Sequence, residues 1–336
     1  MRNETFLRPV RLYGILAGCL GITTVLSLLF GSAVFSPREL WRAFVGEPGY
    51  ETCRFILFSL RFPRLFAACI AGVGLSLSGV LLQNIMSNPL ASPNTIGVNA
   101  GAGLTVVLAL TVFPTAILLL PFAAFSGAFG TSLFILAVSR KAGGGKGTVV
   151  LAGVACTTLF QALISFLSTL DTDVLSLYTS FSIGSLQGVT TEQILLPGAL
   201  VLLCLAAALL LSGRIAVLSL GDGIAASLGV RVTRMRTVCL LLASMSAAAV
   251  ISYAGLLGFV GLVVPHMTRK LIGHDVRHQL GVSALLGALL VMLADLAGRV
   301  LFSPSEISVG ILMSLIGAPF FFILLLKRKE FPDADH

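Results

Sequence analysis

Residues 237–268 read TVCLLLASMSAAAVISYAGLLGFVGLVVPHMT, and the nearest charged residues are Arg236 before this run and Arg269 after it. A transmembrane helix needs about 20 apolar residues, so the run is long for one crossing and short for two. Three glycines and a proline supply places at which a helix can break: Gly255, Gly258, Gly261 and Pro265. The run therefore reads as one very long helix or as two short ones.

When this run is counted as two, the chain contains ten apolar segments. They fall near 12–35, 64–86, 95–113, 115–138, 148–170, 194–212, 237–256, 257–272, 279–302 and 308–326. The first segment follows basic residues, as the apolar core of a signal peptide would, but such a core is only ~7–15 residues long. We therefore expect residues 12–35 to be an uncleaved membrane helix.

The charges of the loops favour ten crossings over nine. With ten crossings and both ends inside, most of the 22 lysines and arginines lie in inside segments: Arg2, Arg8, Arg11, Arg140, Lys141, Lys146, Arg214, Arg231, Arg234, Arg236, Arg269, Lys270, Arg277, Lys327, Arg328 and Lys329. The outside segments carry Arg38, Arg42, Arg54, Arg61, Arg64 and Arg299. If residues 237–268 crossed the membrane only once, the basic loop at 269–277 and the basic C-terminal segment would lie on the sides opposite to those assigned here. The positive-inside rule disfavours that arrangement.

The composition excludes a soluble protein. Hydrophobic residues make up 57% of the 336 and charged residues 11%, against about 45–50% and about 25% in soluble domains. A soluble domain of this length cannot bury so much apolar surface. The net charge of +8 is explained by basic inside loops and does not indicate nucleic acid. We predict an all-α integral membrane protein with one transmembrane domain over residues 1–336.

The chain carries no recognisable energy source. Residues 143–148 (GGGKGT) lack the spacing of a phosphate-binding loop and lie between two apolar segments. Asp295 is the one clear ionisable residue within a predicted crossing, whereas ion-coupled carriers bury several. His274 and His278 have a zinc-ligand spacing but no evident third ligand. We predict no catalytic, cofactor or metal site, and expect another subunit to supply the energy.

Three stretches of sequence carry a family signature. The first combines LRFPR at 60–64, GVGLSLSG at 72–79, Gln83, NPLASP at 88–93 and GVNAGAG at 97–103; the second is ASLGV at 226–230; the third combines GFVGLVVPH at 258–266, DLAGR at 295–299, Glu306, VGI at 309–311 and GAPFF at 317–321. In this order and spacing they closely resemble the FecCD-type permeases, the transmembrane subunits of importers for iron–siderophore, haem and cobalamin. The resemblance spans nearly the whole chain.

The resemblance implies a type II ABC importer permease with ten transmembrane helices and both termini cytoplasmic, in agreement with the count above. It implies that two permeases pair, either two copies or a copy and a paralogue. Two cytoplasmic ATPase subunits would use ATP, and an extracytoplasmic binding protein would deliver the substrate. The chain is then expected in the bacterial cytoplasmic (inner) membrane, surrounded by lipid and without a nucleic-acid partner.

Three arginines are candidates for docking that binding protein. Arg61 and Arg64 flank Pro63 at the predicted outer mouth of the second segment, and arginine forks suit carboxylates. In the resembled family, arginines of this motif receive acidic residues of the binding protein, and Arg299 resembles a third member. The alternatives are anchoring of Arg61 and Arg64 at lipid headgroups, and pairing of Arg299 with Asp295 four residues earlier.

An inside loop is the candidate contact with the ATPase. Residues 221–230 suit a short helix lying in a groove, and Gly229 would cap it. The resemblance implies that this loop, within a cytoplasmic segment at about 214–236, couples ATP hydrolysis to transport. The residues concerned are Gly221, Ala225, Ala226, Ser227, Leu228 and Gly229.

Two further segments carry open alternatives. Asn88, Pro89 and Pro93 break the chain between two apolar segments, and this break either flanks the translocation path or is a structural joint. Residues 178–189 resemble a short outer gate helix of the family, or form a solvated loop.

The substrate expected from the family is a ferric siderophore, because siderophore permeases are its largest group. Haem and cobalamin permeases share the quoted motifs and remain the alternatives. Outside the family, the rivals are an ion-coupled secondary carrier and a passive channel, and a membrane-embedded enzyme is weaker still. The shortage of charged residues within the apolar segments argues against the carrier.

Overall fold

The structure is a computed structural model that describes residues 2–142 and 145–328, so Lys329, Gly143 and Gly144 lie outside the described residues. All regular elements within these ranges are helical. The long helices are α1 (Arg2–Leu29), α4 (Phe62–Met86), α5 (Val98–Val112), α6 (Leu120–Lys141), α7 (Lys146–Leu170), α9 (Thr191–Leu210), α12 (Val232–Ala254), α13 (Val260–Ile272), α14 (Val276–Val300) and α15 (Val309–Arg328). The short ones are α2 (Pro37–Val45), α3 (Glu51–Phe55), α8 (Thr172–Ile183), α10 (Ser212–Ser219) and α11 (Asp222–Ser227).

The prediction of an all-helical membrane protein is confirmed. Within the described ranges, seven stretches are long and apolar enough to cross a membrane: Val10–Leu29, Glu51–Met86, Ile117–Lys141, Gly147–Leu170, Thr191–Leu210, Val232–Ala254 and Val276–Val300. Two further helices are apolar but shorter, Val98–Val112 and Val309–Ile323. Each of the ten predicted apolar segments overlaps one long helix, and α13 is the shortest of them at 13 residues.

The long apolar run at 237–268 forms two helices. α12 ends at Ala254 and α13 begins at Val260. Gly255 has a φ of 69° and Phe259 a φ of 63°, so the backbone leaves the right-handed helical region at both sides of the break. A left-handed conformation is unusual for a phenylalanine, and the space for its ring comes from α15, where Gly317 lies against it. Of the two alternatives for this run, the one with two separate helices is therefore correct.

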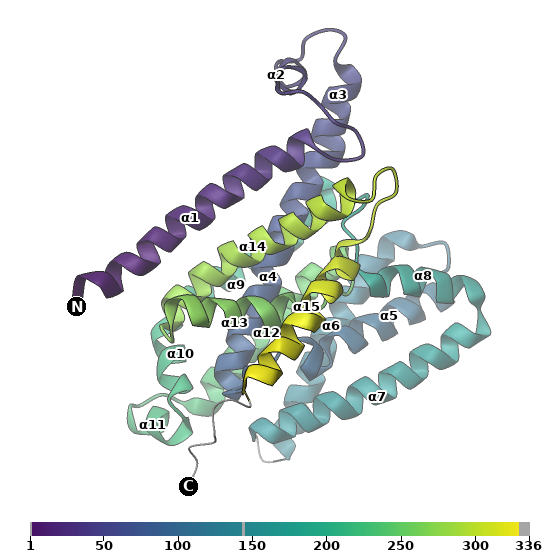
Figure 1. Ribbon diagram of the computed structural model, residues 1–336. Coiled ribbons are helices and arrows are strands. Elements are labelled where there is room, and N and C mark those ends of the chain that lie inside the picture. The colour runs from purple at the N-terminus through teal and green to yellow at the C-terminus, as the bar shows by residue number, and fades with distance from the viewer. Residues whose placement is uncertain (1, 143–144, 329–336) are drawn as a thin grey trace.

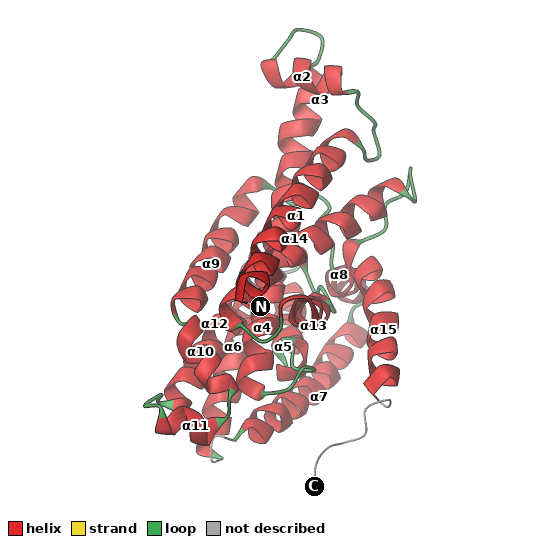
Figure 2. Cartoon of the chain, turned by 60° about the vertical axis from the view of Figure 1, so that its left-hand side comes forward, coloured by secondary structure: helices red, strands yellow, loops and turns green. Residues whose placement is uncertain are grey.

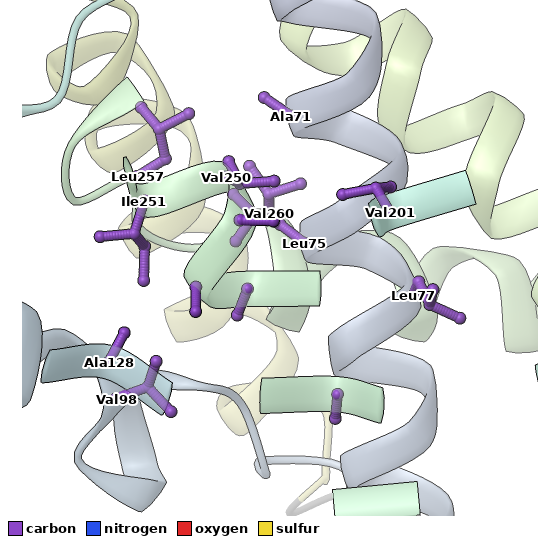
Figure 3. Packing of buried hydrophobic residues seen from close by; sticks show 14 of the residues in the cluster. Ala71, Leu75, Leu77, Val98, Ala128, Val201, Val250, Ile251, Leu257 and Val260 are labelled. Atoms are coloured by element: carbon purple, nitrogen blue, oxygen red, sulfur yellow. The ribbon is translucent and has the colours of Figure 1, made fainter. Parts of the chain in front are cut away.

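Helix α4 is the central element of the bundle (Figures 1 and 2). In the most apolar part of the span Glu51–Met86, which contains α4, 83% of the residues are buried. The corresponding share is 61% in the span that forms α12, and it is smaller in the other candidate spans. Figure 3 shows side chains of α4 (Ala71, Leu75 and Leu77) among residues of α9, α12 and α13. By contrast α1, α7 and α9 expose most of their apolar surface, as helices that face lipid do.

Pairs of glycines bring α4 close to two neighbours. The position where a Cβ of Gly72 would lie is filled by the backbone of Gly287 in α14, and that of Gly79 by the backbone of Gly261 in α13. Small residues at such crossings allow helix backbones to approach within van der Waals contact, which is how helices associate where lipid removes the hydrophobic driving force. The motifs around these glycines therefore have a packing role that sequence alone had left unassigned.

The bundle has two distinct ends. At the α2–α3 end, α2 and α3 project beyond the long helices, and α10 and α11 lie at the opposite α10–α11 end (Figure 1). α1 runs toward the α2–α3 end, and α15 runs away from it (Figure 1). Both ends carry residues singled out by the sequence.

The segment 36–63 links the first two predicted apolar segments and is mostly helical. It forms α2 and α3, and a π-helical turn at Ile56–Arg61 then extends α4. Ser36 and Glu39 form a reciprocal cap at the start of α2, in which the Glu39 carboxylate accepts a hydrogen bond from the Ser36 N–H at 2.7 Å and the Ser36 Oγ accepts one from the Glu39 N–H. Hydrogen bonds from the backbone and side chain of Ser36 lower the pKa of the Glu39 carboxyl. Ser36-Pro37-Arg38-Glu39 is a helix-start pattern that could have revealed α2.

Candidate functional site

A cluster of charged side chains lies at the α2–α3 end of the bundle. Asp295 on α14 accepts from Arg64 on α4, with Oδ1 2.9 Å from Arg64 Nε, and its Oδ2 lies 3.1 Å from Arg299 Nε. Arg64 Nη1 also reaches Glu306 Oε2 at 2.7 Å. The side chain of Asp295 is only 3% exposed and that of Arg64 13%. Buried charges persist where they are paired and hydrogen-bonded, and both conditions hold here.

Two arginines of the same cluster end helix α1. The Arg61 guanidinium donates to the carbonyls of Leu28 and Ala33, and Arg299 donates to Ser27 Oγ at 2.5 Å. The last carbonyls of a helix lack partners within the helix and carry partial negative charge. Arg61 meets both needs at the Leu28 carbonyl, next to the end of α1 at Leu29.

The three arginines predicted for docking thus converge, but they are held internally. Arg61 is 6% exposed and Arg299 4%. The predicted alternative for Arg299, an ion pair with Asp295, is present. Arg61 contacts carbonyl groups and the ring of Phe35, 4.5 Å from its guanidinium. Arg64 and Arg299 therefore pair with Asp295 and Glu306, whereas Arg61 has no carboxylate partner among the described residues, which leaves this cluster with one excess positive charge.

A second junction links the predicted gate helix to three other elements. α8 begins at Thr172, earlier than predicted, with Asp171 as its N-cap. At its other end, Phe181 O accepts from Leu256 N at 3.2 Å, Ser185 N donates to Ala254 O at 2.9 Å, and Gly310 N donates to Gly184 O at 3.2 Å. The end of α8 is thereby bonded to the α12–α13 break and to the start of α15.

The break at Asn88–Pro93 is exposed at its start and buried at its end. Asn88 Oδ1 accepts from Leu90 N at 2.9 Å and forms a tight turn after α4. Pro89 follows within this turn. Pro93 is buried and lies near Gly261 of α13. Pro93 is therefore packed against the bundle, and a role of the break beside the translocation path stays a prediction.

The α10–α11 end carries the predicted coupling loop. α11 covers Asp222–Ser227, and Gly229 has a φ of 80°. Gly229 N donates to Ala226 O at 3.0 Å and Val230 N to Ala225 O at 2.9 Å, the paired bonds of a Schellman cap. The predicted short helix with Gly229 as its cap is confirmed.

One face of α11 is anchored and the other is exposed. Ala225 is fully buried, whereas Ile224 is 51% and Leu228 61% exposed. Asp222 forms an ion pair with Arg236 of α12 at 2.8 Å. Gly221 begins the helix at a φ of 112°, and Ser227 Oγ bonds Ile224 O within it. The exposed apolar side chains suit a partner surface.

The two histidines with zinc-ligand spacing belong to a helix start. Asp275 caps α14 through Arg277 N at 2.9 Å, and the ring of His278 lies 6.1 Å from that of Tyr13. His274 is exposed. Within the part of the chain that the structure describes, no three potential ligands gather at a metal-binding distance.

Comparisons with known proteins cover nearly the whole chain. The family model described as the FecCD transport family matches residues 19–327. The Fe(3+)-citrate import system permease protein YfmE of Bacillus subtilis (strain 168) is 32% identical over 95% of this chain and 95% of its own. The ferric enterobactin transport system permease protein FepD of Escherichia coli (strain K12) is 38% identical over 92% of each. A metal-chelate type ABC transporter solved in an inward-facing conformation superposes with a TM-score of 0.85 at 34% identity, over 95% of this chain and 99% of that one.

Proposed function

This chain belongs to the FecCD transport family, and from that premise we propose that it is the membrane-spanning subunit of an ATP-driven importer for a ferric siderophore. The observation that carries the proposal is the full-length match to permeases of ferric-chelate importers. Haem and cobalamin are the alternative cargoes within the family. The chain itself would make and break no bonds.

In the proposed topology the chain crosses the membrane ten times, with both termini in the cytoplasm. The α10–α11 end then faces the cytoplasm and the α2–α3 end faces outward. The support is the distribution of basic residues, which are concentrated in the loops assigned to the inside. The separation of α12 from α13 supports it as well, because the two helices supply the crossings that the charge pattern requires.

Energy would come from two ATPase subunits that dock at α11. This short helix ends in a Schellman cap and has an exposed apolar face with Ile224 and Leu228. The bidentate Asp222–Arg236 pair ties it to α12. A push on α11 would therefore be transmitted to a long membrane helix, which is what coupling requires.

The delivering binding protein would dock at the arginine cluster. Its support is the excess positive charge of the cluster, in which Arg64 and Arg299 pair with Asp295 and Glu306 while Arg61 has no carboxylate partner among the described residues. Acidic side chains on the delivery protein would be attracted to this charge and oriented by it. Because the arginines also hold α1 and α14, docking would be felt directly by the helix bundle.

The path would lie between two permeases, with α8 as its outer gate. The support is the backbone junction at Phe181–Ser185, which bonds α8 to both the α12–α13 break and α15. A movement of any one of these elements displaces the other two. The gate and the coupling helix are thereby connected through α12, which begins next to α11 and ends at the junction.

Uptake in living cells tests the proposal. A strain that lacks the gene is complemented with a plasmid copy and given labelled ferric siderophores, haem and cobalamin in parallel, with and without a working ATPase partner. We expect one ferric siderophore to enter only when both the gene and the ATPase are present. Uptake that persists after the ATPase is disabled would support a secondary carrier, and gene-dependent uptake of haem or cobalamin alone would reassign the cargo.

A further inference from the structure

A cavity of about 720 Å³ lies at the α10–α11 end, beside the coupling helix. Its walls come from α10, from the turn that follows α11, and from the first two turns of α12. A second cavity of about 760 Å³ lies against the same first turn of α12 and shares Arg231 and Arg234 with it. The two hollows together make an indented basic surface at this end.

Three arginines line the first of these two cavities, and they carry its charge. Arg214 comes from α10, Arg231 from the turn before α12, and Arg234 from α12. All three are exposed, and none of the described lining residues is acidic. Arg236, two residues further on, is different, because it forms an ion pair with Asp222. The cavity is therefore a site for an anion that the chain does not itself provide.

The remaining wall of the cavity is apolar and reaches into the membrane-spanning helices. Leu211 directly follows Thr191–Leu210, a candidate membrane span, and Met235 and Val238 lie inside the span Val232–Ala254. A free inorganic anion would gain nothing from this wall. A molecule with an anionic group at one end and hydrocarbon at the other would use both halves of the site.

We infer that this cavity binds an anionic phospholipid, with its phosphate group between Arg214, Arg231 and Arg234 and the upper parts of its acyl chains against Leu211 and Val238. Arginine suits a phosphate because its planar fork donates two parallel hydrogen bonds. Basic pockets between membrane helices on the cytoplasmic side bind anionic lipid headgroups. An ordinary inside loop has the charges without the apolar recess.

The bound lipid would also contact the coupling helix. Leu228 and Gly229, which close α11, belong to the lining of the same cavity. A lipid headgroup seated there would support the capped end of α11 and favour its observed position on α12. This consequence for coupling rests on the proposed function, whereas the binding of the lipid does not.

Native mass spectrometry of the permease purified with its ATPase subunits tests the inference. The complex is placed in nanodiscs of phosphatidylcholine that contain a small fraction of phosphatidylglycerol, and the retained lipid is counted after transfer to detergent. The test variant combines Arg214→Gln, Arg231→Gln and Arg234→Gln. The control combines Lys141→Gln, Lys270→Gln and Arg277→Gln, which removes three charges from exposed positions of the same predicted side but outside the cavity.

We expect the test variant to lose retained phosphatidylglycerol by roughly ten- to a hundredfold, and the control to keep it, because three basic contacts are removed only in the former. Inorganic phosphate at millimolar concentration should not displace the lipid from the unaltered protein; displacement would identify the site as one for free phosphate. Equal retention by the test variant and the control overturns the inference. So does a test variant that keeps the lipid but releases its ATPase subunits, since the arginines would then contact protein. A chain that fails in siderophore uptake but retains the lipid would refute only the proposed cargo.

Discussion

Asp295 pairs with two arginines at once, since its Oδ1 lies 2.9 Å from Arg64 Nε while its Oδ2 lies 3.1 Å from Arg299 Nε. This one carboxylate joins α4 to α14, and through Arg299 it also reaches the end of α1. It is the only residue that the sequence marked as an ionisable group inside an apolar segment. Its neighbours explain how it is tolerated there.

Replacing Asp295 by alanine should destabilise the protein strongly. Two nearly buried arginines would lose their shared carboxylate, and breaking a buried ion pair by removing one partner costs about 3–5 kcal/mol. Thermal unfolding of the purified protein in detergent measures the loss. Asp171→Ala, at an exposed helix cap, should cost only about 1 kcal/mol; equal losses in the two variants would show that the cluster contributes little.

Substituting Gly79 and Gly21 by alanine should change stability in opposite directions. A Cβ on Gly79 would meet the backbone of Gly261, whereas a Cβ on Gly21 would meet nothing within 4 Å. Gly79→Ala is expected to cost about 1–3 kcal/mol through overpacking. Gly21→Ala, in the exposed part of α1, should gain about 0.5–1 kcal/mol from the helix preference of alanine. A stabilised Gly79→Ala protein would contradict the close crossing of α4 and α13.

The conformation of Gly229 should matter for coupling, and Gly223 provides the matched control. Neither glycine has an atom near its missing Cβ, but only Gly229 has a positive φ. A left-handed alanine costs roughly 1–2 kcal/mol, which reduces the population of the capped loop by about 5–30-fold. Substrate-stimulated ATP hydrolysis by the assembled transporter should therefore fall in Gly229→Ala and stay near normal in Gly223→Ala. Equal activity in the two variants would exclude a role for the cap.

Association of the delivery protein should depend on salt through Arg61. Its charge is not balanced by a carboxylate among the described residues. Although the Arg61 side chain is only 6% exposed, its charge contributes to the long-range field that steers association, and salt weakens that field. The association rate with the reconstituted transporter is expected to fall by about tenfold between low and physiological salt. Arg61→Gln should flatten this dependence, whereas Arg277→Gln at the opposite end should leave it unchanged. An unaltered salt dependence in Arg61→Gln would place the docking charge elsewhere.

The structure also changes how docking should be probed. Substitution of both Arg61 and Arg64 by glutamate would test docking only if it left the bundle intact. Arg64→Glu would instead bring a third carboxylate against Asp295 and Glu306, and like charges at this distance repel in a poorly solvated site. A failure of that double variant to transport would follow from misfolding as readily as from lost docking. Neutral substitutions are therefore the informative ones.

The parts of the fold that follow from local chemistry were predictable from the sequence. Gly255 marked the break between α12 and α13, and Gly229 marked the end of α11, because each occupies a backbone conformation that glycine adopts readily. The helix α2 was missed although Ser36 and Glu39 form a recognisable capping box. That signal was present, and the low hydrophobicity of the segment obscured it.

The parts that depend on long-range contacts were not predictable. Nothing near Arg64 in the sequence indicates Glu306, which lies 306 − 64 = 242 residues later, and Gly310 gives no sign that its amide bonds the end of α8. A docking role and a packing role for an arginine leave the same local pattern. Only the positions of α1 and α14 distinguish the residues that hold the bundle together from residues that merely face outward.

The glycine contact between α4 and α14 has a consequence for how the chain is made. Gly287 follows Gly72 by 287 − 72 = 215 residues, which a ribosome adds in about 10–40 s at ~5–20 residues per second. During that time the helix that ends up most buried has no permanent neighbour on that side, and its glycine-lined face is open to bilayer lipid or to the insertion machinery. The centre of the finished protein is thus synthesised early and enclosed late, and the cell has to protect it in the interval.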